Sequence, residues 1–171
     1  MCIRDRYLVD VETQKKQLIL GKEKEPSANS ALAFDKDDKG VFYITDKFSQ
    51  FSQLTYHNLE SGEDLIISSE IPWDVDGFAM SEDGKRAAFV VNENGYSTLY
   101  LLDPKSFQFK KVNSIPLGLI GGMQFDNNKR LGLTINTHQT PSDSYVLDLK
   151  RNVLSHGKLE RWTYSEVGGL D

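Results

Sequence analysis

A motif recurs about every 45 residues along this chain of 171 residues, and the period limits the possible folds more than any other feature. One phase of the repeat, at steps of 46 and 45 residues, holds Ala33-Phe34-Asp35, Ala79-Met80-Ser81 and Gln124-Phe125-Asp126. A second phase, at the ends of mostly apolar runs, holds Asp10, Asn58, Asp103 and Asp148. A period of roughly 40 to 50 residues is typical of β-propeller blades, which stack because one blade alone cannot bury its apolar faces.

Each full unit contains four short candidate strands separated by turn residues. Asp83-Gly84 and Asn94-Gly95 are strong hairpin signals, because glycine accepts the positive φ of tight turns. Between them, residues 86–92 form a nearly continuous apolar run, which predicts a strand buried on both faces. The sequence therefore predicts an all-β chain: a partial β-propeller of about three four-stranded antiparallel blades plus half of a preceding blade. The half blade is expected at 7–21 and the blades at about 30–69, 75–113 and 119–163.

The two ends of the chain carry separate expectations. Residues 1–6 resemble a non-native scar from a translated sequencing adapter, and blade sequence begins abruptly at Tyr7. Residues 7–171 are expected to be a fragment of one propeller domain, because propellers close with roughly four to eight blades. Residues 164–171 are interpreted as its exit segment. The single cysteine, Cys2, leaves no internal disulfide to predict.

Charge and hydropathy exclude two classes of partner. The net charge is −5, and the 26% of charged residues are evenly mixed, without the basic stripe of a nucleic-acid-binding protein. No apolar run approaches the ~20 residues of a membrane-spanning helix. We therefore expect neither nucleic-acid binding nor a membrane segment, and no motif calls for a cofactor. The single cysteine does not distinguish a cytoplasmic from a periplasmic location.

No catalytic or metal-binding pattern stands out among the nucleophiles and histidines. Ser97 lies in Gly95-Tyr-Ser-Thr-Leu99, which lacks the second glycine of a nucleophile elbow and precedes a strand rather than a helix. We interpret it as a serine that opens a strand. His57, His138 and His156 fall at different phases of the repeat and lack metal-ligand spacing. They are predicted to be exposed polar residues, with His138 in a loop and His156 in a turn.

Two groups of carboxylates allow a functional and a structural interpretation. The segment Asp35-Lys-Asp-Asp38 has oxygen ligands that would suit calcium, but a strand begins inside the would-be loop, which favours an ordinary turn. Asp74 and Asp76 are spaced so that an extended segment would bring both to one face, where they could serve acid–base chemistry. A loop that enters an inner strand explains the same pair.

Aromatic side chains gather in connections that emerge at one end of the blades. Phe48, Phe51, Trp73 and Tyr96 lie between the second and third strands of a unit or between units. The segments 71–73 and 115–117, both Ile-Pro followed by a large apolar residue, add to them. Exposed apolar patches usually mark interfaces, so these residues are candidates for domain contact or gating. The alternative is that they pack between adjacent blades.

Several ordered segments resemble the N-terminal propeller of the prolyl oligopeptidase family of serine peptidases, in its dipeptidyl- and acylaminoacyl-peptidase-like branch. They are Ile71-Pro-Trp-Asp-Val-Asp-Gly-Phe-Ala-Met-Ser-Glu-Asp-Gly84 and the segments 92–103, 116–125 and 140–148. Arg161-Trp-Thr-Tyr-Ser-Glu-Val-Gly-Gly-Leu170 is similar to the place where such a propeller ends. The resemblance spans 7–171 and implies the C-terminal blades of that domain.

In that family the propeller is a non-catalytic lid over an α/β-hydrolase domain, which supplies the catalytic serine, aspartate and histidine. The resemblance therefore implies a substrate-gating lid that is not catalytic itself, whose partners are the missing hydrolase domain and short peptide substrates. A free-standing protein-binding propeller, like the periplasmic propeller of the Tol system, is the alternative. A propeller enzyme with a site of its own, such as a lactonase or a glycosidase, is a third.

Overall fold

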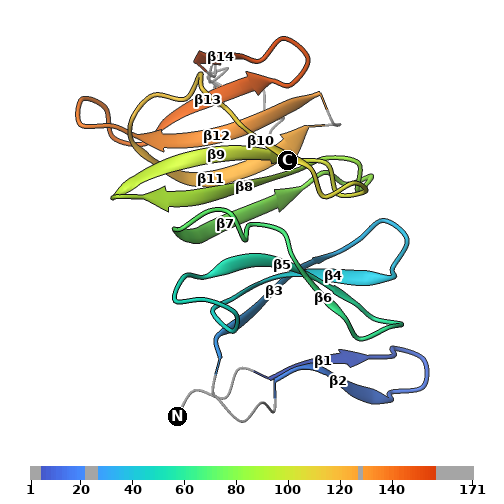
Figure 1. Cartoon of the computed structure of the whole chain (residues 1–171). Helices are drawn as coiled ribbons and strands as arrows, with labels where there is room; N and C mark the ends of the chain where they lie inside the picture. Colours follow the sequence, from blue (N-terminus) through green and yellow to red (C-terminus); the bar gives the residue numbers. More distant parts are fainter. Residues whose placement is uncertain (1–4, 22–26, 127–128, 157–171) are drawn as a thin grey trace, which may run out of the picture.

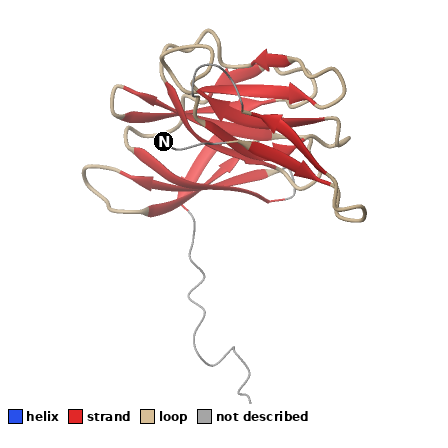
Figure 2. Ribbon diagram, turned by 90° about the horizontal axis from the view of Figure 1, so that it is seen from below, coloured by secondary structure: helices blue, strands red, loops and turns tan. Residues whose placement is uncertain are grey.

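The computed structural model describes residues 5–21, 27–126 and 129–156, and within these residues the chain is all-β, with no helix (Figures 1 and 2). Fourteen strands form one two-stranded and three four-stranded antiparallel sheets. The half blade is β1 (Arg6–Val9) and β2 (Lys16–Leu20). The first blade is β3 (Asn29–Phe34), β4 (Gly40–Thr45), β5 (Gln53–Asn58) and β6 (Asp64–Ile66). The second is β7 (Asp74–Met80), β8 (Ala87–Glu93), β9 (Tyr96–Leu102) and β10 (Phe109–Lys111), and the third is β11 (Leu119–Asp126), β12 (Arg130–Asn136), β13 (Asp143–Asp148) and β14 (Val153–His156).

The sheets are stacked in chain order, each with its strands in sequential order, as consecutive propeller blades are (Figure 1). The first strands of the second and third blades, β7 and β11, lie next to each other. Each first strand carries a β-bulge, between Ala31 and Ala33, Val75 and Gly77, and Ile120 and Gly122. These features confirm the predicted partial propeller of about three four-stranded blades.

Two apolar layers hold the three blades together, and both depend on β8. Ala87, Phe89 and Val91 face the first blade, where they pack with Phe42 and Leu54 among others; we call this the first interblade layer. The opposite face of β8 meets the third blade in the second interblade layer, whose buried members are Ala88, Val90, Leu99, Val112, Leu131, Leu133, Ile135 and Leu147. The continuous apolar run of β8 is therefore buried on both faces, as the sequence predicts.

The third blade presents a different kind of face on its other side. In the second blade the paired residues Val90 and Leu99 belong to the second interblade layer. The matching pair in the third blade is Thr134 and Ser144. This outer face is therefore smaller and more polar, and an apolar layer of the same kind does not continue across it.

One turn recurs between the last two strands of all four sheets and explains the second phase of the repeat. Asp10, Asn58, Asp103 and Asp148 each accept a backbone N–H two or three residues later through Oδ1, at 2.6 to 3.4 Å. The residue four positions on donates its own N–H back to the first residue's carbonyl at 2.8 to 2.9 Å and has positive φ. These residues are Gln14, Gly62, Phe107 and Asn152. The aspartate or asparagine that ends each apolar run therefore caps the turn that follows it.

The outer strand of the second blade begins later than the sequence predicts. The sequence predicts an outer strand at 107–112, but Phe107 lies in the recurring turn with φ 58°. Its ring packs 4.9 Å from that of Tyr56 on the first blade. The turn therefore consumes the first residues of that run, and β10 covers only Phe109–Lys111.

Some expectations fall partly or wholly outside the described residues. These are positions 1–4 of the suspected scar, the end of the third blade beyond residue 156, the segment 161–170 and the exit segment 164–171. Arg6 is already part of β1, opposite Leu20. The part of the chain that the structure describes holds no helix with the length and apolar character of a membrane span.

The recurring turn generates a prediction about acid stability. Hydrogen bonds from the backbone N–H of Lys105 and of Ser106, with the charge of Arg86, lower the pKa of Asp103 against the opposing effect of burial. A lowered folded-state pKa gives stability that is present above the ordinary pKa of 3.8 and is lost as the pH falls through the folded value. We expect Asp103→Asn, which copies Asn58, to lose less stability between pH 6 and pH 3 than the parent. Asp103→Ala should cost about 1 kcal/mol at neutral pH. Urea titrations at the two pH values test this, and equal acid sensitivity of parent and Asp103→Asn would contradict it.

The left-handed turn position generates a second prediction. Phe107→Gly removes the strain of positive φ on a bulky residue, but it also removes a ring that packs on Tyr56 and Phe42. We expect a net loss of about 2 kcal/mol, because loss of a packed aromatic outweighs roughly 1 kcal/mol of strain relief. Gln14→Gly, at the same turn position with an exposed side chain, is the control and should not destabilise. A stability gain in Phe107→Gly would show that the ring packing is unimportant.

Candidate functional site

Phe51 and Trp73, two of the four predicted contact residues, are brought together at one end of the blades. Phe51 lies in the β4–β5 loop and Trp73 in the connection from β6 to β7. Asp74 Oδ1 accepts the N–H of Ser52 at 2.7 Å, and Val75 donates its N–H to the carbonyl of Ser52 at 2.8 Å. These bonds fix the two segments side by side, with the ring centroids 6.5 Å apart. Trp73 remains 38% exposed, so both packing and contact roles are open to it.

Phe48 lies in the same β4–β5 loop but contacts a charged group rather than the aromatic pair. The ammonium of Lys47 is 4.9 Å from the centre of the Phe48 ring, a cation–π distance. Lys47 Nζ is also 3.3 Å from Asp64 Oδ2 on β6. The loop is therefore tied to the outer strand while the ring stays partly exposed.

Tyr96 opens β9 on the second blade. It follows Asn94-Gly95, both at positive φ, and is 51% exposed. Beside it, Ser97 donates its N–H to the carbonyl of Gly118 at 2.9 Å and accepts the N–H of Ile120 through Oγ at 2.9 Å. These bonds place Leu117, which is 73% exposed, and Leu119 near the start of β9.

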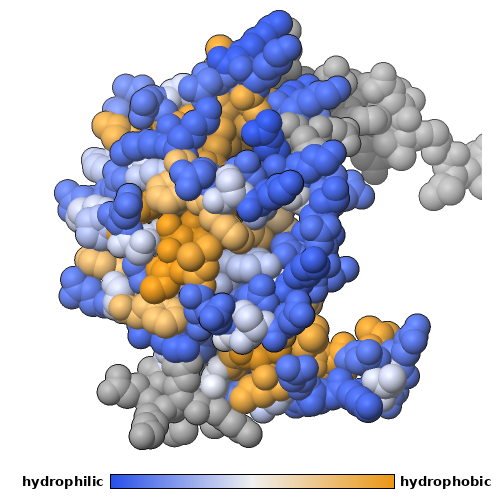
Figure 3. All heavy atoms as spheres, turned by 45° about the vertical axis from the view of Figure 1, so that its right-hand side comes forward, coloured by the Kyte–Doolittle hydropathy of each residue, from blue (hydrophilic) through white to orange (hydrophobic). Residues whose placement is uncertain are grey.

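Together these residues form what we call the apolar end surface. Its members are Phe48, Phe51, Trp73, Tyr96, Leu117 and Leu119. All lie at the end of the sheets where the first and third strands of a blade begin, since Asp74 pairs with Asn92 and Leu119 with Asn136. Figure 3 shows that apolar surface on one face of the molecule occurs in separate areas bordered by hydrophilic residues. The sequence signals for Leu117 are its Ile-Pro context and loop position; sequence reasoning misses Leu119 because it has the pattern of an ordinary strand residue.

Two predicted members of this surface are core residues instead. Ile71 is buried in the first interblade layer. Ile115 packs against the second interblade layer. Each segment connects the outer strand of one blade to the inner strand of the next. Its isoleucine faces the core, whereas Trp73 and Leu117, two residues further on, are exposed.

The histidine predictions are partly wrong. His57 is only 9% exposed, and its Nδ1 lies 2.8 Å from Asp64 Oδ1. It is buried because Asp64 on β6 stands directly opposite it in the sheet and supplies a partner. His138 is exposed in a loop, as predicted. His156, predicted in a turn, instead ends β14, with its backbone opposite Tyr145.

The carboxylates and Ser97 have structural roles. Asp35 accepts the N–H groups of Asp37 and Lys39 through Oδ1, at 3.2 and 2.8 Å, and the hydroxyl of Tyr56 through Oδ2 at 2.5 Å. The interpretation of this segment as the β3–β4 turn is therefore confirmed. Asp76 lies at the β7 bulge, whereas Asp74 is bonded to Ser52, so the two carboxylates have separate environments. Within the described residues no three His, Cys, Asp or Glu side chains are arranged to hold a metal ion.

Comparison with known proteins shows the fold. No family model matches the chain, and no curated protein matches its sequence. Among solved structures, TolB from Acinetobacter baumannii aligns with a TM-score of 0.64 and 19% identity over 89% of this chain and 37% of its own. A prolyl endopeptidase aligns with a TM-score of 0.72 and 10% identity over 90% of this chain and 22% of its own. An oligogalacturonate lyase solved with manganese gives a TM-score of 0.69 and 14% identity over 86% and 40%.

Other peptidases resemble the chain to a similar degree, at 16% to 20% identity and a TM-score of 0.65. The chain spans between about a fifth and two fifths of the structures named above. These likenesses agree with a partial β-propeller of the kind found in prolyl oligopeptidase-family peptidases and TolB proteins.

Proposed function

We propose that this chain is the propeller portion of a serine peptidase of the prolyl oligopeptidase family, in its dipeptidyl- and acylaminoacyl-peptidase-like branch, acting on short peptides. Catalysis would come from an α/β-hydrolase domain of the same protein, outside these residues. The fold similarity to peptidase propellers supports the proposal, as do the segments 71–84 and 92–103 that resemble this family. Ser97, whose sequence context comes nearest to a nucleophile elbow, holds two strands together through its backbone and its hydroxyl.

The observation that carries the proposal is the apolar end surface. A domain that acts as a lid needs a face that contacts the catalytic domain, and partly exposed large apolar side chains at one end of the blades supply such a face. Trp73 and Tyr96 belong to the residue types that dominate interface energetics. The surface is built on strand ends and short hydrogen-bonded connections, so it needs little ordering on association.

The mechanism would be selection by access. Rigid blades around a bore or side opening let short peptides reach the catalytic domain and exclude folded proteins by size. The stacking of the blades through two buried apolar layers provides the required rigidity.

A protein-binding propeller is a second candidate, and the likeness to TolB favours it. In that case the apolar end surface would bind another protein rather than a domain of the same chain. The two candidates differ in whether the natural protein contains a reactive serine.

The first test labels the natural protein with a fluorophosphonate, which reacts with activated serines. We expect one labelled serine, located outside these 171 residues, and loss of short-peptide cleavage on labelling. Absence of any label, with no peptidase activity, would overturn the peptidase assignment in favour of the binding propeller. A label on Ser97 would overturn the non-catalytic role.

The second test concerns the apolar end surface in the same natural protein. Trp73→Ala should lower peptide cleavage several-fold and weaken the contact between domains, while the unfolding temperature of the propeller changes little. Phe34→Ala removes a comparably exposed aromatic residue at the opposite end of the first blade and is the matched control. If Trp73→Ala unfolds the propeller but leaves domain association intact, Trp73 is a packing residue and the surface is not an interface.

A further inference from the structure

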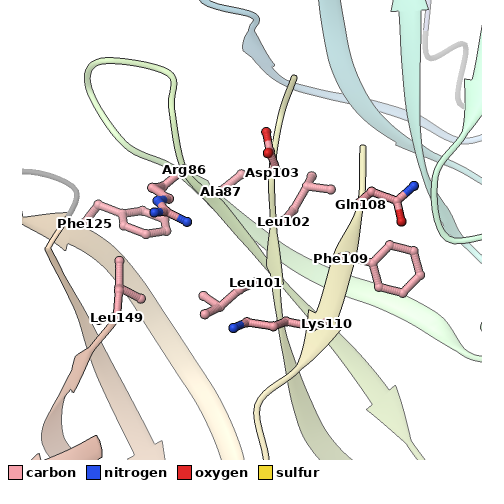
Figure 4. A pocket seen from close by; sticks show the side chains of 10 residues that line it. All are labelled: Arg86, Ala87, Leu101, Leu102, Asp103, Gln108, Phe109, Lys110, Phe125 and Leu149. Atoms are coloured by element: carbon pink, nitrogen blue, oxygen red, sulfur yellow. The ribbon is translucent and has the colours of Figure 1, made fainter. Parts of the chain in front are cut away.

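An open slot lies between the second and third blades, at the end opposite the apolar end surface. It has a volume of about 210 Å³. The second blade contributes Arg86, Leu101 and Lys110 to its lining, and the third contributes Phe125 and Leu149. Figure 4 shows the Arg86 guanidinium beside the Phe125 ring, with Leu101, Leu149 and Lys110 around the same space. The slot is therefore apolar at its base and cationic at its rim.

The corresponding place between the first and second blades is filled by two aromatic rings. Tyr56 lies directly over Gly40, where an added Cβ would come within 2.2 Å of the ring. The Tyr56 hydroxyl donates to Asp35 at 2.5 Å, and its ring lies 4.9 Å from Phe107 of the second blade. These two rings therefore occupy the position that the slot has between the second and third blades.

The register of the repeat shows which residues replace the two rings in the slot. Tyr56 pairs with Leu65 on the first blade, and the matching pair on the second blade is Leu101 with Lys110. Phe107 is the fifth residue of the recurring turn in the second blade, and the fifth residue of the same turn in the third blade is Asn152. In the β3–β4 turn the carbonyl of Gly40 accepts the N–H of Asp35, and in the β7–β8 turn the carbonyl of Arg86 accepts the N–H of Ser81. Arg86 therefore occupies the position of Gly40. The slot therefore lacks the two rings, and it has the cationic Arg86 and Lys110 where the first interface has the neutral Gly40 and Leu65.

The charges at the rim favour an anion. Within the described residues, neither Arg86 nor Lys110 has a carboxylate at ion-pair distance, although the charge of Arg86 acts on Asp103 from farther away. The next residue, Lys111, is paired with Glu93 at 3.0 Å. Both side chains are exposed and so can be reached from solvent. Asp103 is the one carboxylate in the lining, and Figure 4 shows it directed away from Phe125 and Leu149. Its Oδ1 already accepts backbone hydrogen bonds in the recurring turn.

We propose that this slot binds a small aryl carboxylate. The aromatic ring of the ligand would occupy the space that Tyr56 and Phe107 fill in the neighbouring interface, against Leu101, Leu149 and Phe125. Its carboxylate would accept hydrogen bonds from the Arg86 guanidinium, which is suited to bidentate recognition, and face the Lys110 ammonium. The volume suits one ring with a short acidic side chain, since drug-sized ligands occupy pockets of roughly 300 Å³ or more.

The test is a ligand-observed NMR titration of the full chain with phenylacetate, and with the neutral phenylacetamide for comparison. We expect saturable binding of phenylacetate and at least about tenfold weaker binding of the amide, because charge-assisted hydrogen bonds are lost. Arg86→Gln should weaken phenylacetate binding by a similar factor. Leu101→Tyr, which restores the ring found at Tyr56, should abolish binding while the melting temperature is maintained.

Lys85→Gln is the matched control, because Lys85 is the neighbouring cation, is paired with Asp83 and does not line the slot. It should change phenylacetate binding by less than about twofold. Absence of saturable phenylacetate binding by the parent would overturn the proposal. Equal binding of the amide, or equal weakening by Lys85→Gln and Arg86→Gln, would also overturn it.

Discussion

The structure depends on the burial of both faces of β8. Its alternate residues enter the two interblade layers in turn, so one strand links all three four-stranded blades. Neither layer could form from a single sheet, because an isolated second blade would expose both apolar faces of β8 to water. Loss of a large buried side chain such as Phe89 would leave a cavity in the first layer and cost about 3 to 5 kcal/mol. The turns and loops are positioned by this stack, including those that carry the apolar end surface.

The repeat also provides an internal reference for recognising functional positions. Each turn after the third strand uses the same hydrogen bonds, whether its first residue is Asp103 or Asn58. Against that constant framework, Arg86, Leu101 and Lys110 depart from their counterparts Gly40, Tyr56 and Leu65. The turns and strand pairings do not require those changes, because the first and second blades pack through the Tyr56 and Phe107 rings at the same place. A repeat protein thus allows a binding slot to be inferred by comparing its own units.

Much of the fold could be predicted from the sequence, because the period, the turn residues and the burial of 86–92 all follow from local pattern. The strand predicted at 86–92 is β8, Ala87–Glu93, and it is buried on both faces. The errors concern side-chain contacts between strands. His57 is buried against Asp64 of the neighbouring strand in its own sheet, and Phe107 packs on Tyr56 of another blade, so neither environment follows from the residue's own place in the repeat. The apolar end surface could be predicted in part, whereas the slot needs two registered blades to be visible.

Native-state hydrogen exchange resolved by residue tests the stacking of the blades most directly. If β8 is sandwiched between two apolar layers, its amides should exchange more slowly than those of the other strands, through global unfolding alone. Amides of the two-stranded β1–β2 sheet should exchange much faster, by local opening. Equal exchange rates in β8 and in β1–β2, or faster exchange in β8, would contradict a stack of blades joined through β8.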